Sequence, residues 1–177
     1  MRLKSILVAL TILTSSLFLT TPASAAEKGY RYWGYFQSAP GKTTWIAAMT
    51  GPTVDIADGS VEGWSFVFGS DDIPSLAPKV KPDFKKICGG TKADPDTKRI
   101  ALVIDFGSTA WAPKGEKPAK GITRCVRTAK TSQGIDVLGQ VVKIRAASSG
   151  LICGLNGFPA KECGVEIPTP KALAAKK

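Results

Sequence analysis

Hydrophobic and polar residues alternate over several short stretches of the chain, and this pattern predicts more strands than helices. Aromatic and β-branched residues fill 30–38 and 43–50, with a Pro-Gly pair between the two runs, which is typical of two strands joined by a turn. A third strand is expected over 61–68, directly after the turn signal Asp58-Gly59. The run 99–107 has an unbroken apolar centre, which indicates a central strand covered on both faces.

The second half of the chain predicts shorter elements. Strands are expected over 121–127 and 151–155, and after the latter the turn Asn156-Gly157 leads into a returning strand. A short helix is expected over 82–88, which opens with proline and an acid and ends with lysines before two glycines. A second is expected over 131–142, where apolar residues recur at helical spacing. The predicted fold class is therefore α+β, a small, mostly antiparallel β domain with two short helices.

The start of the chain predicts export. Residues 1–25 begin with Arg2 and Lys4, continue with an apolar run and end in Ala-Ser-Ala, which is typical of a signal peptide cleaved after Ala25. No second apolar run of about 18 residues follows, so no transmembrane segment is expected in the mature chain. We therefore expect a secreted, extracellular protein with a single globular domain over 26–170 and a polar tail over 171–177.

The charge balance suggests acidic partners. The chain carries 24 Lys and Arg against 14 Asp and Glu, a formal net charge of +10. Such a field favours anionic wall polymers, lipid headgroups or an acidic protein, although solubility alone can also explain it. Nucleic acid is not an expected partner, because no nucleic-acid-binding motif is present. The excess cations form two clusters: Lys79, Lys81, Lys85 and Lys86, and Lys114, Lys117 and Lys120.

The chain contains no histidine, and this excludes several kinds of chemistry. A Ser-His-Asp or Cys-His catalytic site, a histidine-ligated zinc and a histidine pH switch all need that residue. The stretch 94–99 begins like a calcium loop but lacks its central glycine and distal glutamate. We expect no enzyme, no catalytic residue, no metal and no cofactor. An enzyme that uses carboxylates alone stays open, although no pair of acids stands out.

Four cysteines in a small exported chain predict two disulfides. Three connectivities are open. Cys153 and Cys163 flank a turn, which favours their pairing with each other and leaves Cys88 to pair with Cys125. No closely spaced cysteine pair is present, so neither a zinc site nor a Cys-x-x-Cys redox centre is expected.

Aromatic residues crowd the first part of the mature chain, and two interpretations are open. They can fill the core, as aromatic side chains do in small β domains, or some can form an exposed surface for a flat ligand. For the second case we expect a ligand face that includes Tyr35, Trp45 and Trp64. Asn156 and Phe158 would join it from the turn after the predicted strand 151–155, where Phe158 is expected to be exposed at the tip.

Several motifs together resemble a family of actinobacterial secreted proteins of unknown function. They are YRYWGYF, W-x-x-A-x-x-G-P, DGSVEGWSF, PDFKKICGGT, KRIALVIDFG, RCV and GLICGLNGFPAKECG, and they cover nearly the whole mature chain. Genes of that family often lie beside a vitamin-type energy-coupling-factor transporter and a helical-toroid protein. The resemblance therefore implies a role in nutrient capture, with a membrane transport component as a partner.

A fainter resemblance concerns the C-terminal β domain of cobalamin carriers. The run GIDVLGQVVKIRAASSGLICGLNGFP is similar to the opening half of that domain, and the run from Trp45 to Phe66 is similar to its closing half. The halves stand in swapped order here and the cysteines are extra. The likeness implies a non-enzymatic binding protein that captures a small corrinoid-like ligand and presents it to an uptake system. The alternative is a cell-envelope protein that binds anionic wall polymer through its lysines.

Overall fold

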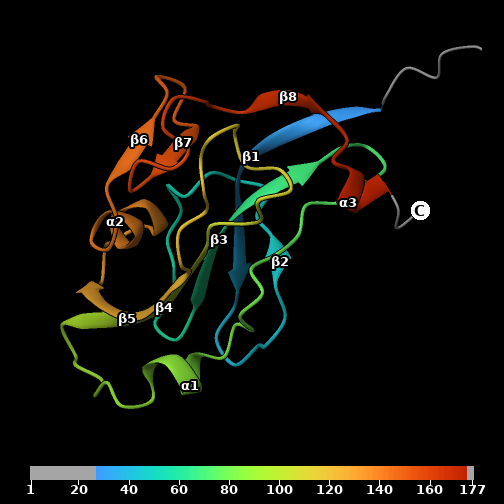
Figure 1. Cartoon of the computed structure of the whole chain (residues 1–177). Coiled ribbons are helices and arrows are strands. Elements are labelled where there is room, and N and C mark those ends of the chain that lie inside the picture. The colour runs from blue at the N-terminus through green and yellow to red at the C-terminus, as the bar shows by residue number, and fades with distance from the viewer. Residues whose placement is uncertain (1–26, 175–177) are drawn as a thin grey trace, which may run out of the picture.

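The computed structural model describes residues 27–174, and the predicted signal peptide lies outside the described residues. Eight strands and three short helices follow one another in this part of the chain (Figure 1). In chain order they are β1 (Lys28–Ser38), β2 (Ile46–Ala47), β3 (Val61–Gly69), α1 (Phe84–Cys88), β4 (Thr97–Asp105), β5 (Ile122–Ala129), α2 (Gly134–Gly139), β6 (Ile144–Ala146), β7 (Ile152–Leu155), β8 (Val165–Pro168) and α3 (Lys171–Ala174).

One main sheet organises the domain. Its strand order is β2-β1-β3-β4-β5, and β8 also pairs with β1, along the half of β1 that β2 does not reach. Every pair is antiparallel except β3 and β4, which are parallel because the connection through α1 crosses from one end of the sheet to the other. A separate hairpin of β6 and β7 accompanies it. The predicted α+β class with mostly antiparallel strands is confirmed.

The main sheet is covered on both faces, and β3 is buried along nearly its whole length. Trp64, Phe66 and Phe68 point to the larger core, which α2, β6 and β7 cover with their apolar side chains. Val61, at the start of β3, points to a smaller core on the opposite face, together with Cys88 of α1. Because strand side chains alternate between faces, a strand with apolar residues on both faces fits only between two cores. The same holds for β4, the predicted central strand.

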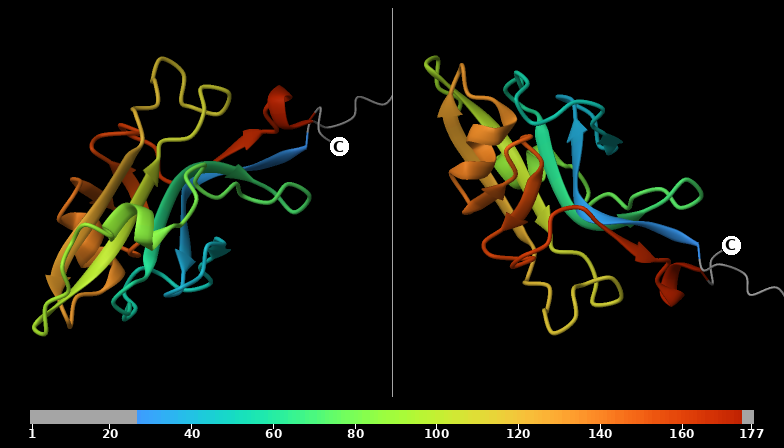
Figure 2. Two further views of the ribbon diagram at one scale, coloured as in Figure 1. Left: turned by 90° about the horizontal axis from the view of Figure 1, so that it is seen from below. Right: turned by 90° about the horizontal axis from the view of Figure 1, so that it is seen from above.

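Two features of the chain trace set the outer shape. Figure 1 shows α2, β6 and β7 gathered together at the left of the molecule, while α3 lies at the right. In both views of Figure 2, β8 runs beside the start of β1, and the two extend away from the rest of the sheet. The first and last strands of the described chain are thus neighbours.

Both disulfides form with the favoured connectivity. Cys88 at the end of α1 joins Cys125 of β5, with their Cα atoms 5.0 Å apart. Cys153 of β7 joins Cys163, which precedes β8, with a Cα separation of 4.3 Å. The first bridge fixes α1 against the edge of the sheet. The second closes the loop that follows the β6–β7 hairpin.

Three local predictions were wrong or incomplete. The second predicted strand shrinks to the two residues of β2. No returning strand follows Asn156-Gly157, because β6 already pairs with β7 and Pro159 has no N–H to donate to a ladder. Helix α3 was not anticipated in the polar tail. It forms there because Leu173 is buried against the larger core.

Candidate functional site

A mostly apolar cavity lies on the face of the sheet that α2 and the β6–β7 hairpin cover. Its volume is about 620 Å³, within the range of about 300–1,000 Å³ that is typical of small-molecule sites. Its floor is aromatic and comes from β1 and β3, and its walls come from the loop 51–53, from Ile135 of α2 and from the segment 146–152. The lining contains no charged side chain, so the cavity suits a mostly apolar ligand.

The aromatic floor follows directly from strand geometry. Trp33 and Tyr35 lie two positions apart on β1 and therefore share a face. Tyr35 stands opposite Trp64 across the β1–β3 pair, and the two rings stack with centroids 4.8 Å apart and planes inclined by 21°. Trp64 is 2% exposed and Tyr35 is half-buried, so the stacked pair gives the cavity a rigid aromatic floor that is accessible through the Tyr35 ring.

The indole N–H of Trp64 has no acceptor among residues 27–174, although the side chain is only 2% exposed. The other three tryptophans each donate to a backbone carbonyl: Trp33 to Phe158 at 3.1 Å, Trp45 to Val80 at 3.0 Å and Trp111 to Phe66 at 2.9 Å. An unpaired buried donor costs about 1–3 kcal/mol. Buried polar groups are rarely left unpaired, and Trp64 is the one cavity-lining residue among the four with such an atom in residues 27–174, the others being Ser38, Thr97 and Arg145.

A buried polar cluster holds Tyr35 in place. Its hydroxyl donates to the carboxylate of Glu62, and the amide of Gln37 donates to the Tyr35 hydroxyl at 2.9 Å and to Glu62 at 3.4 Å. Glu62 is 1% exposed, and burial raises its pKa, while the hydrogen bonds from Tyr35 and Gln37 and the charge of Lys98 act in the opposite direction. Burial and the neighbouring carboxylate likewise raise the pKa of Tyr35. The carboxylate therefore positions the tyrosine ring.

The wall opposite the sheet is fixed to α2 by its backbone. The N–H of Ile135 donates to the carbonyl of Pro52 at 2.9 Å, and the N–H of Gly134 donates to that of Val54 at 3.4 Å. Gly134 has no room for a side chain, because a Cβ would lie 2.7 Å from the Tyr35 hydroxyl. The loop and the first turn of α2 thus close over the polar cluster as one unit.

Of the residues predicted to form a ligand face, the structure brings two together. Tyr35 and Trp64 line the cavity. Trp45 lies on the opposite face of the sheet, where its ring covers Gly63. Asn156 is exposed and outside the cavity, and its side-chain oxygen accepts a hydrogen bond from the Lys143 N–H at 2.9 Å.

The expectation that Phe158 is exposed at the tip of its turn is wrong. Its side chain is 6% exposed, and its ring packs edge-on against Phe66, with centroids 4.9 Å apart, and against Phe106 at 6.0 Å. Paired backbone hydrogen bonds between Leu155 and Phe158 fold the turn tightly. The ring is thereby directed toward the sheet and away from solvent.

Sequence reasoning did not select Trp33, Pro52 or Ile135 for the site. Trp33 could have been found, because it lies two positions before Tyr35 in the same predicted strand. The wall residues had no comparable signal, since only the tertiary fold places their loop and helix over the sheet.

Residues 27–174 contain neither a metal-binding cluster nor a membrane-spanning helix. No group of three or more His, Cys, Asp and Glu side chains in this part of the chain is arranged to hold a metal ion. Within the same residues, no helix combines the length and the apolar character needed to cross a membrane.

Fold and cavity together define a disulfide-linked α+β domain with an aromatic cavity of small-molecule size. The family model described as the SCO2322-like domain matches residues 25–168, and the chain belongs to this family. The matched span contains all eight strands and both disulfides. This family match confirms the general resemblance found from the sequence, which was to an actinobacterial family of unknown function. None of the curated proteins and none of the solved structures matches the chain.

Proposed function

We propose that the protein is a secreted, non-enzymatic binding protein that captures a small, flat, mostly apolar ligand in the aromatic cavity and presents it to an uptake system. The observation that carries this proposal is the stacked pair of Tyr35 and Trp64 at the floor of an uncharged cavity of about 620 Å³. Apolar cavities lined by aromatic side chains with few polar groups are typical of ligand sites.

Two observations support binding over catalysis. The chain has no histidine to act as a general base near neutral pH. The buried carboxylate of Glu62, behind the cavity-lining Tyr35, already accepts hydrogen bonds from Tyr35 and Gln37. Export is supported by the predicted signal peptide and by the two disulfides, which are typical of proteins that fold in oxidising compartments.

The likeness to cobalamin carriers makes a corrinoid the first ligand to test. A cavity of this volume can enclose a drug-sized molecule or one edge of a larger macrocycle. Native mass spectrometry of protein purified from the producing organism should show a bound small molecule. That molecule, together with cobalamin and a neutral disaccharide as probes, can then be titrated by calorimetry.

A matched pair of exposed leucines tests the location of binding. Leu151 is 43% exposed and lines the cavity, whereas Leu76 is 49% exposed and lies outside it. We expect Leu151→Trp to weaken binding at least about tenfold by obstructing the cavity, and Leu76→Trp to bind as the wild type does. The ligand-induced change in tryptophan fluorescence should persist in Trp45→Phe, because Trp45 lies on the other face of the sheet.

Two results would overturn the proposal. One is the absence of any co-purified molecule together with no response to cobalamin or sugar. The other is a ligand whose affinity is the same in the wild type and in Leu151→Trp.

A further inference from the structure

A second concave surface lies between α1 and β5. This cleft has a volume of about 770 Å³. The segment 80–87 forms one wall and contributes Lys81 and Lys86, and β5 forms the other wall and contributes Arg124. Asp83 is the one acidic residue among those that line the cleft. In contrast to the aromatic cavity, the cleft is therefore basic.

The positive charge of the cleft is not balanced from within the described part of the chain. Lys81, Lys86 and Arg124 make no ion pair with any residue of 27–174. The carboxylate of Asp83 caps α1 by accepting the backbone N–H of Lys86 at 2.9 Å. Neighbouring cations differ, because Lys79 lies 3.8 Å from Asp105 and other arginines nearby are paired with aspartates. Unpaired cations around a concavity concentrate positive potential inside it.

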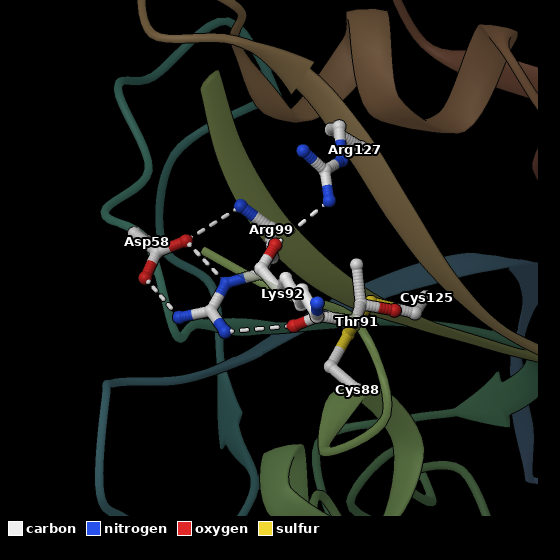
Figure 3. Close-up of a disulfide and its surroundings, with 7 residues drawn as sticks. All are labelled: Asp58, Cys88, Thr91, Lys92, Arg99, Cys125 and Arg127. Carbon is white, nitrogen blue, oxygen red and sulfur yellow. Dashed lines mark hydrogen bonds and ion pairs between the residues drawn. A yellow bond between two sulfur atoms is a disulfide. The ribbon is translucent and has the colours of Figure 1, made fainter. Parts of the chain in front are cut away.

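The two walls are held together covalently. The Cys88–Cys125 disulfide joins the end of α1 to β5 (Figure 3). The loop that follows α1 is fixed by two arginines: Arg99 donates to the carbonyl of Thr91 at 3.0 Å, and Arg127 donates to that of Lys92 at 2.7 Å. A cleft with fixed walls loses little conformational freedom when a ligand enters.

The second lysine cluster of the chain does not lie in this cleft. Lys114, Lys117 and Lys120 are exposed, and none of them lines the cleft. Figure 2 shows their loop, between β4 and β5, projecting from the sheet in both views. The three cations of the cleft and the three lysines of the loop carry the same charge, but only the former line a concave surface. A comparison of the two groups can therefore distinguish binding in the cleft from general electrostatic attraction.

We infer that the α1–β5 cleft is a binding site for the phosphodiester groups of an anionic polymer. Lysine and arginine are the side chains that bind phosphate oxygens, and the cleft also contains Val80 and Ile87, which can contact the carbon atoms between successive phosphates. A concave site admits a polymer strand more readily than it fits the surface of a bilayer. The inference is independent of the aromatic cavity, which lies on the opposite face of the sheet from α1.

The test compares two triple variants that remove the same charge. The cleft variant is Lys81→Gln, Lys86→Gln and Arg124→Gln, and the control variant is Lys114→Gln, Lys117→Gln and Lys120→Gln. The probe is an oligomer of glycerol phosphate, titrated by calorimetry at moderate salt. We expect the cleft variant to lose at least about tenfold in affinity and the control to lose less than about threefold. Equal losses in both variants would show long-range attraction only and would overturn the inference.

Two additional arms identify the source of the phosphate. Inorganic phosphate alone should bind far more weakly than the oligomer, because it offers a single group. Vesicles of phosphatidylglycerol that bind in a cleft-dependent way, while the oligomer does not, would place a membrane at this surface and overturn the polymer assignment. Thermal melting of both triple variants checks that they fold, and Lys86→Gln alone should give a partial loss of affinity.

Discussion

Phe158 provides a direct test of how the turn after β7 is built. Its side chain is 6% exposed and contacts two phenylalanine rings. Burial of an aromatic side chain removes about 200 Å² from water, which at about 25 cal/mol per Å² amounts to about 5 kcal/mol. Alanine retains a small part of this contact, so Phe158→Ala should lower the free energy of unfolding by about 4 kcal/mol.

Urea unfolding followed by circular dichroism measures this loss. Lys161→Ala is the matched control, since Lys161 is exposed in the same loop, and it should change the free energy of unfolding by less than about 0.5 kcal/mol. Phe158→Leu should lose about 1 kcal/mol, because leucine keeps most of the apolar volume. If Phe158→Ala is as mild as the lysine control, the ring does not pack in the core and the account of this turn is refuted.

Two other properties follow from the cross-links and from the buried carboxylate. Replacing Cys88 and Cys125 by alanine should lower the free energy of unfolding by about 4 kcal/mol, and replacing Cys153 and Cys163 by about 3 kcal/mol, because the first bridge closes the longer loop, with a sequence separation of 37 against 10. Urea unfolding gives both values, and the reverse order would contradict the loop-closure argument. Burial raises the pKa of Glu62, so its proton stabilises the fold at acid pH, and this contribution falls as the pH rises from the usual carboxyl range through the raised pKa. Glu62→Gln should remove that fall in melts between about pH 4 and pH 8, and an unchanged slope would argue against it.

Elements whose signals are local were predictable from the sequence. The unbroken apolar run of β4 required cover on both faces, and the turn signal before β3 marked where that strand begins. The cysteine pairing also followed, because Cys153 and Cys163 flank a turn in the chain. For Cys153 and Cys163, residues close in sequence are also close in space.

Features that depend on distant segments were not predictable in the same way. The parallel pairing of β3 with β4 is set by the path of the connection through α1. Strand β8 forms only because β1 offers a free edge. Both depend on the assembled sheet, which periodicity within a segment does not describe.

The candidate site also contains some features with a local sequence signal and others that depend on distant segments. Tyr35 and Trp64 were placed in one predicted ligand face from the sequence, and they stack, but the β1–β3 pairing that brings them together was not predicted. Trp45 is also a tryptophan, but it lies directly before the short strand β2, and its ring packs on the opposite face of the sheet. Phe158 looked exposed because it follows an Asn-Gly turn, and the phenylalanines that cover it lie far away in sequence.

The pairing of β1 with β8 has a consequence for the order of folding. Lys28 stands opposite Pro168, and Arg31 stands opposite Val165, so the first strand cannot complete its hydrogen-bond ladder until the last strand is available. Pairing across so long a loop is slow to form. If the chain becomes available for folding from its N-terminal end, β1 must wait for nearly the whole domain before β8 can pair with it. The pairing of β1 with β8 would then be a late step in folding.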